Sequence, residues 1–140
     1  MKRLAALLAV LAVASPAAGG APHVRKQQAL FVFGRSGGSI RPFRASIAAD
    51  GVVSVSGGVR RLGSVTLPRP ALGGLQKLAQ AVGFYSLPAN INCPGPGGFA
   101  NEYIHVHTAT RDKRVQEYGG CRPGFDQLFE VLKAVSALRD

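Results

Sequence analysis

Acidic residues are scarce in this sequence: 140 residues include seven Asp and Glu against 17 Lys and Arg. They are scattered at Asp50, Glu102, Asp112, Glu117, Asp126, Glu130 and Asp140. Hydrolases that use two carboxyl groups need a spatial pair, and such a pair is hard to find here. The sequence also lacks the glycine loop with lysine that cradles phosphates and the dinucleotide-binding fingerprint. We therefore expect neither an enzyme nor a cofactor.

Long hydrophobic runs are equally scarce. The apolar run Leu4–Val13 follows a basic N-terminus. At its end, Ala12 and Ala14 form the small-x-small pattern that signal peptidase recognises. This run spans too little of a hydrocarbon core of about 30 Å to act as a transmembrane helix. The pattern predicts a signal peptide and disordered leader over 1–22, a single domain over 23–140, and a secreted or periplasmic protein.

The excess of basic residues limits the classes of partner. Without Lys2 and Arg3, 15 basic residues stand against seven acidic ones, a formal charge of +8. Such a balance favours anionic partners such as wall polymers, lipid headgroups or an acidic protein face. The arginines are spread along the chain, however, and solvated arginines on strand faces are the plainer interpretation. No nucleic-acid-binding module or interleaved aromatic pattern is present, so specific nucleic-acid binding is not expected.

The chain has two cysteines, Cys93 and Cys121, and no Cys-x-x-Cys motif. In an exported protein, such a pair is expected to form a disulfide bond. Cys93 lies in the Pro- and Gly-rich stretch 87–100, and Cys121 precedes a helical pattern. The bond would hold this long loop over the start of that helix.

Apolar and alternating segments predict the fold class. Strands are expected near 29–34, 41–48, 53–55, 59–67, 102–108 and 114–118, with a polar turn at 110–113. Helices are expected at 70–82 and from Phe125 to about Arg139. The order β-β-β-β-α-β-β-α predicts an α+β fold, in which an antiparallel sheet of five to six strands carries both helices on one face.

The segment from Gly34 to Gly38 contains Arg35, Ser36 and Gly37 and formally matches the Gly-x-Ser-x-Gly nucleophile elbow. An elbow needs a helix directly after the serine, whereas an alternating strand pattern follows here. We therefore interpret the segment as a tight or binding loop at the end of the first strand.

Two histidines, His105 and His107, are expected on one face of a strand. A metal site needs a third ligand. The acids expected nearest to the pair are Glu102, on the opposite strand face, and Glu117. Exposed strand histidines are therefore the plainer interpretation, and no metal site is predicted.

The pattern as a whole resembles the emfourin-like family, which includes small inhibitors of thermolysin-type metalloproteases. The segments that carry the resemblance are Arg35–Gly38, the helix 70–82 with the following Gly-Phe-Tyr-Ser-Leu-Pro, the Asn101-Glu102-Tyr103 run and the terminal leucine-rich helix. The chain departs from the family at Asn101, where the family has aspartate. The cysteine pair and the export signal are not general family features.

These observations favour an exported binding protein over an enzyme. The resemblance implies an inhibitor of a thermolysin-type metalloprotease that acts through the glycine-rich loop. Arg35 is the expected polar anchor, with Ser36 and the amides of Gly37 and Gly38 beside it. The alternative is a cationic envelope-associated protein that binds anionic surface polymers through its arginines.

Overall fold

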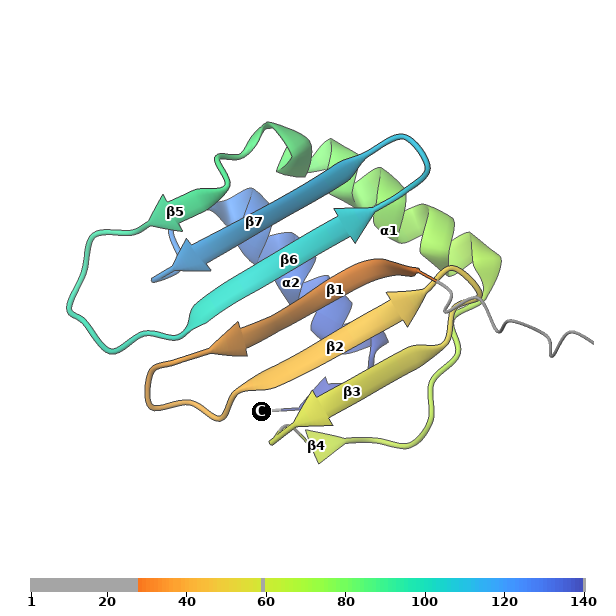
Figure 1. The fold of residues 1–140 in the computed structure, drawn as a ribbon, viewed down its shortest axis with the longest axis horizontal. Coiled ribbons are helices and arrows are strands. Elements are labelled where there is room, and N and C mark those ends of the chain that lie inside the picture. The colour runs from red at the N-terminus through yellow and green to blue at the C-terminus, as the bar shows by residue number, and fades with distance from the viewer. Residues whose placement is uncertain (1–27, 59, 140) are drawn as a thin grey trace, which may run out of the picture.

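The computed structural model describes residues 28–58 and 60–139. The predicted signal peptide and leader, 1–22, lie outside the described residues. A six-stranded sheet has the order β3-β2-β1-β6-β7-β5 (Figure 1). In addition, β4 pairs with β8 in a separate two-stranded sheet. The strands are β1 (Ala29–Ser36), β2 (Phe43–Ala48), β3 (Val53–Gly57), β4 (Arg60–Arg61), β5 (Asn90–Asn92), β6 (Asn101–His107), β7 (Asp112–Tyr118) and β8 (Leu138–Arg139). The helices are α1 (Arg69–Ala81), α2 (Pro123–Val135) and the short 3-10 helix η1 (Phe84–Ser86).

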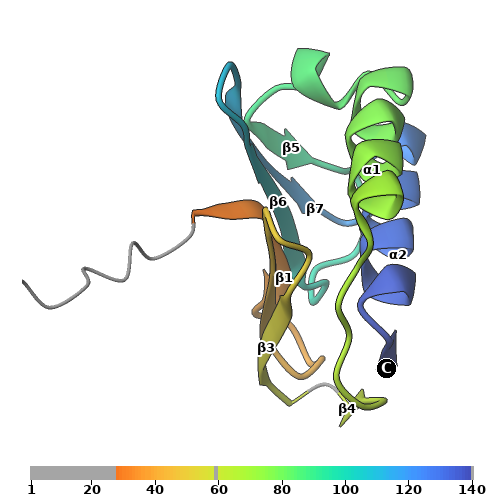
Figure 2. The ribbon, with the colours of Figure 1, turned by 90° about the vertical axis from the view of Figure 1, so that its right-hand side faces the viewer.

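Both long helices cover the same face of the six-stranded sheet (Figure 2). Alternate residues of the central strands, such as Phe31, Phe33 and Ile104, point to this face and are fully buried. They pack in one hydrophobic core with the apolar stripes of α1 and α2. The α+β prediction and the placement of both helices on one face are confirmed. The other face, which we call the open face, is covered by no helix of the described residues (Figure 2).

The sheet is mixed rather than wholly antiparallel. The short β5 runs parallel to β7, within the stretch 87–100 that was expected to be a loop without regular structure. Ile91 is the one buried residue of β5. A strand of three residues with one apolar side chain leaves too weak an alternation to detect in the sequence.

The predicted strand over 59–67 is also much shorter in the structure. β4 contains Arg60 and Arg61, which pair with Arg139 and Leu138 of β8. The second helix therefore ends at Val135 rather than near Arg139. Ala137, with φ of 54°, turns the chain back towards β4.

Within the described residues, none of the helices combines the length and the hydrophobicity that crossing a membrane requires.

Candidate functional site

Two loops meet at one end of the sheet and form what we call the loop end. They are the β1–β2 loop, 37–42, and the β5–β6 loop, 93–100, which project on the same side of Figure 1. Gly38 has a φ of +68°, and a Cβ built on it would lie 2.9 Å from the backbone nitrogen of Ala100 and from the backbone oxygen of Gly98. Because only glycine fits both this conformation and this close approach, Gly38 allows the two loops to pack as one surface.

The predicted binding residues divide into two groups. Ser36, Gly37 and Gly38 are exposed at the loop end, as expected. Arg35 lies within β1, which continues to Ser36 rather than ending near Gly34, and it is only 7% exposed. The pairing of β1 with strands on both sides extends the strand through Arg35, which faces the helix-covered side.

Arg35 holds the β1–β2 loop in shape. Its Nε donates a hydrogen bond of 3.1 Å to the carbonyl oxygen of Arg41, across the loop. Its guanidinium carbon lies 5.3 Å from the centre of the Phe43 ring, within the range of a cation–π interaction. The buried Arg35 side chain therefore stabilises the conformation of the loop, whereas Ser36, Gly37 and Gly38 are exposed to solvent.

Two exposed apolar side chains distinguish the loop end from an ordinary glycine turn. Ile40 is 45% exposed and Phe99 is 44% exposed, and both line a hollow of about 200 Å³. Tyr118 supports Phe99: the two rings lie edge to face at 6.3 Å, and the Tyr118 hydroxyl accepts a hydrogen bond of 3.0 Å from the backbone N–H of Gly98. Tyr118 therefore holds both the exposed Phe99 ring and the neighbouring backbone in position.

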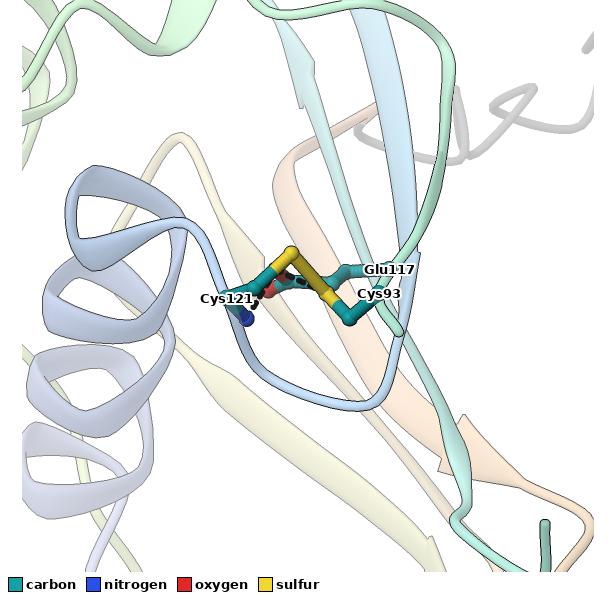
Figure 3. A group of neighbouring side chains, drawn as sticks. All are labelled: Cys93, Glu117 and Cys121. Atoms are coloured by element: carbon teal, nitrogen blue, oxygen red, sulfur yellow. Dashed lines mark hydrogen bonds between the residues drawn. A yellow bond between two sulfur atoms is a disulfide. The ribbon is translucent and has the colours of Figure 1, made fainter. Parts of the chain in front are cut away.

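A disulfide anchors the β5–β6 loop, as the sequence predicted. Cys93 at its start is bonded to Cys121, with 5.6 Å between the two Cα atoms. The bond joins the loop to the segment that leads into α2 (Figure 3). The bond therefore holds the base of the Phe99-bearing loop against the helical layer.

Glu117 of β7 lies beside this disulfide and is 1% exposed. Its Oε1 accepts hydrogen bonds of 2.9 Å from the backbone N–H groups of Cys121 and Arg122, and it contacts the sulfur of Cys93 at 3.3 Å. Burial raises the pKa of the Glu117 carboxyl, and the neighbouring Asp126 carboxyl raises it further.

Glu102 of β6 stands directly opposite Glu117 in the β6–β7 register, and both line the hollow beside Ile40 and Phe99. Burial raises the pKa of Glu102 to about 7, although the charges of Lys133 and Arg35 oppose this effect. The fold thus brings together two acids that are scattered in the sequence. The strand assignments place both residues on one face, but the exact register that pairs them cannot be read from the sequence.

Ser36 of β1 lies beside the start of β6, whereas the two histidines lie towards the end of β6. Ser36 pairs with Asn101, whereas His105 pairs with Val32. Four residues of strand separate these positions, or about 13 Å. The structure therefore does not combine the serine and the imidazoles in one arrangement.

The histidines do meet an acid, but not one of the two named from the sequence. β7 begins at Asp112, two residues earlier than predicted, so that Asp112 stands opposite His107. The carboxylate contacts both His105 and His107 on the open face. The predicted turn, 110–113, leaves Asp112 outside the strand. A hairpin turn that ends before Asp112 places its carboxylate opposite His107.

A larger surface hollow, of about 570 Å³, lies between α1 and the β6–β7 hairpin. Gln76, Lys77 and Gln80 line it together with threonines of the hairpin. Tyr85 and Arg111 also line it, and the guanidinium of Arg111 lies over the Tyr85 ring. None of the described acidic residues or histidines lines this hollow, so we place the candidate site at the loop end. Comparison of the chain with protein-family models, curated proteins and solved structures finds no match.

Proposed function

We propose that this chain is an exported binding protein whose contact surface for a partner protein is the loop end. One observation carries the proposal: the two loops pack through Gly38, and Ile40 and Phe99 are exposed around one hollow on the combined surface. Aromatic side chains such as Phe99 are enriched in protein interfaces, and burial of exposed apolar surface is a main driving force of association.

The support beneath the loops favours binding with little rearrangement. Arg35 holds one loop, and the disulfide and Tyr118 hold the other. A surface that is already ordered loses less conformational entropy on association, so more of the contact energy contributes to affinity. The disulfide also suits an oxidising compartment outside the cytosol.

The resemblance to emfourin-like proteins suggests a thermolysin-type metalloprotease as the partner. Under this proposal the loop end blocks the protease, Ser36, Gly37 and Gly38 contribute backbone and hydroxyl contacts, and the chain itself performs no catalysis. Arg35 acts through the shape of the loop rather than as an anchor.

The test is an inhibition titration against thermolysin-type proteases with the parent chain, Phe99→Ala and Leu62→Ala. Leu62 is the control, because it is 49% exposed and follows β4, which pairs with β8 rather than with either loop. We expect Phe99→Ala to weaken inhibition at least about tenfold, as loss of an interface anchor does, and Leu62→Ala to match the parent. Full protease activity at micromolar excess of the parent would overturn the inhibitor assignment.

A second candidate is the binding of anionic envelope polymers. Eight arginines of the described residues are exposed, and they are spread over four strands, one helix and the connecting segments: Arg41, Arg44, Arg60, Arg69, Arg111, Arg114, Arg122 and Arg139. A diffuse cationic surface of this kind predicts affinity that falls steeply with salt. Inhibition through a shape-matched loop end retains much more of its affinity, so the salt dependence separates the two candidates.

A further inference from the structure

The open face of β6 carries two histidines on one side of the strand. His105 and His107 are two residues apart and therefore project to the same face. The alternate residues Ile104 and Val106 are fully buried on the other face. The side chains of His105 and His107 are 34% and 30% exposed, so both imidazoles are partly sheltered yet accessible to solvent.

A third donor comes from the neighbouring strand. Asp112 stands opposite His107, and its two carboxylate oxygens face the two imidazoles. Oδ1 contacts Nε2 of His105, and Oδ2 lies 3.3 Å from Nδ1 of His107. One donor atom from each of the three residues lies within 4.8 Å of the other two. Donor atoms this close can reach one ion at ligand distances of about 2 Å with small side-chain movements.

The backbone that carries these donors is well fixed. The backbone N–H of Thr108 donates a hydrogen bond of 2.7 Å to the carbonyl oxygen of Arg111 and closes the hairpin. The Thr108 hydroxyl oxygen also accepts a hydrogen bond of 3.0 Å from the backbone N–H of Arg111. Ligands held on paired strands keep their geometry better than ligands on loops.

The nearby cations are directed to other groups. The guanidinium carbons of Arg111 and Arg114 lie 4.4 and 5.2 Å from the ring centres of Tyr85 and Tyr103. The amino group of Lys113 donates a hydrogen bond of 2.6 Å to a backbone carbonyl oxygen. None of these contacts uses the Asp112 carboxylate, which therefore supplies negative charge to the donor cluster.

We propose that His105, His107 and Asp112 bind a late divalent transition-metal ion, Zn²⁺. Two imidazoles and one carboxylate match the nitrogen and oxygen donors of three-ligand zinc sites, in which a fourth position remains for water or an outside ligand. Mg²⁺ and Ca²⁺ prefer oxygen donors and do not suit two imidazoles. Binding requires neutral imidazoles, so each proton on a donor nitrogen is released to solvent as the metal takes its place.

Among the described residues, a second group with potential metal ligands consists of Cys93, Glu117 and Cys121. This group is not a candidate metal site. Its two sulfur atoms are bonded to each other, and a disulfide offers no thiolate to a metal. The assignment to the open face is independent of the function proposed for the loop end.

The test is calorimetric titration of the tag-free, disulfide-bonded chain with Zn²⁺, together with visible absorption spectra after titration with Co²⁺. We expect one ion per chain and a tetrahedral Co²⁺ spectrum. The double variant His105→Ala/His107→Ala should lose binding, and Asp112→Asn should weaken it at least about tenfold. His23→Ala, which removes the third histidine of the chain, serves as the control and should bind like the parent.

Circular dichroism of each variant checks that it folds, because these side chains are partly exposed and their loss should leave the core intact. Zn²⁺ should also raise the melting temperature of the parent and of His23→Ala, but not that of the double variant. Absence of saturable Zn²⁺ binding to the parent would overturn the proposal. Equal affinity of the parent and the folded double variant would overturn it as well.

Discussion

Oε1 of Glu117 accepts a hydrogen bond of 2.9 Å from the backbone N–H of Cys121. The same oxygen accepts a second hydrogen bond from Arg122, the N-cap residue of α2, whose own side chain makes no capping hydrogen bond. A carboxyl group of the sheet thus satisfies N–H groups at the start of the helix, where negative charge is also favoured by the helix dipole. Sheet, disulfide and second helix are joined at this one side chain.

Glu117→Ala should therefore lower the free energy of unfolding by about 2 kcal/mol or more at pH 7, because it leaves two backbone N–H groups without their acceptor. Glu117→Gln retains an oxygen acceptor and should lose less. Urea unfolding of both variants measures the difference. A Glu117→Ala variant as stable as the parent would contradict the capping role.

Loss of the disulfide should also destabilise the chain. The bond joins residues 28 positions apart, and in the chain-entropy treatment a loop of this length is worth about 3.5 kcal/mol. Cys93→Ala/Cys121→Ala should unfold at a correspondingly lower urea concentration. The parent treated with reductant is the control and should approach the double variant. If reduction leaves the stability of the parent unchanged, the bond does not support the fold.

Gly38→Ala should separate the effect of loop packing from that of backbone conformation. Gly37 has a similar φ of +75°, but the nearest atom to a Cβ built there is 4.0 Å away. Gly37→Ala should therefore cost only the left-handed strain, about 1 kcal/mol. Gly38→Ala should cost more, because its Cβ would press on backbone atoms of the β5–β6 loop. Urea unfolding, with hydrogen exchange of that loop, checks both. Equal effects of the two substitutions would show that the loops are not packed tightly at Gly38.

The sequence was sufficient to predict the elements with strong periodicity. The apolar stripe of α2, with Phe125, Leu128 and Leu132 buried as expected, and the alternation of β6 both correspond to structure. The parallel strand β5 and the short pair β4 and β8 were missed, because two or three residues carry no period that can be recognised. Their pairing depends on tertiary contacts.

The candidate site was predictable only in part. Exposed glycines at 37 and 38 were identified from the loop composition, whereas the burial of Arg35 depends on how far β1 extends. The alignment of Glu102 with Glu117, and of His107 with Asp112, depends on the register of one hairpin. The hydrophobic alternation of the two strands fixes which residues share a face, but it does not exclude a shift of two residues. Neither pairing could therefore be established before the hairpin turn was known.

Gly74→Ala should stabilise the protein by about 0.5 to 1 kcal/mol. Gly74 is an exposed residue within α1, and no atom lies within 4 Å of a Cβ built there. Alanine restricts the unfolded chain and favours the helix at such a position. The midpoint of urea unfolding should rise. A fall would mean that this part of α1 needs the freedom of glycine.

Glu102→Gln should change how stability depends on pH. Because the pKa of Glu102 rises from 4.5 to about 7 on folding, the unfolded chain releases this proton at lower pH than the folded chain does. The group therefore imposes no cost below pH 4.5, and it progressively lowers the stability of the parent as the pH rises from 4.5 through 7.

Glu102→Gln removes that cost, so its advantage over the parent should be small at pH 4 and should grow to on the order of 1 kcal/mol at pH 8, since water that reaches this half-buried carboxyl screens it. Urea unfolding of parent and variant across this range measures the change. Asp50→Asn is the control: Asp50 is exposed on the β2–β3 turn, and its asparagine keeps the oxygen that accepts the backbone N–H of Val52. If the Glu102→Gln advantage is the same at pH 4 and pH 8, the carboxyl does not titrate near neutrality in the folded chain, and the hollow beside Phe99 carries a full negative charge at pH 7.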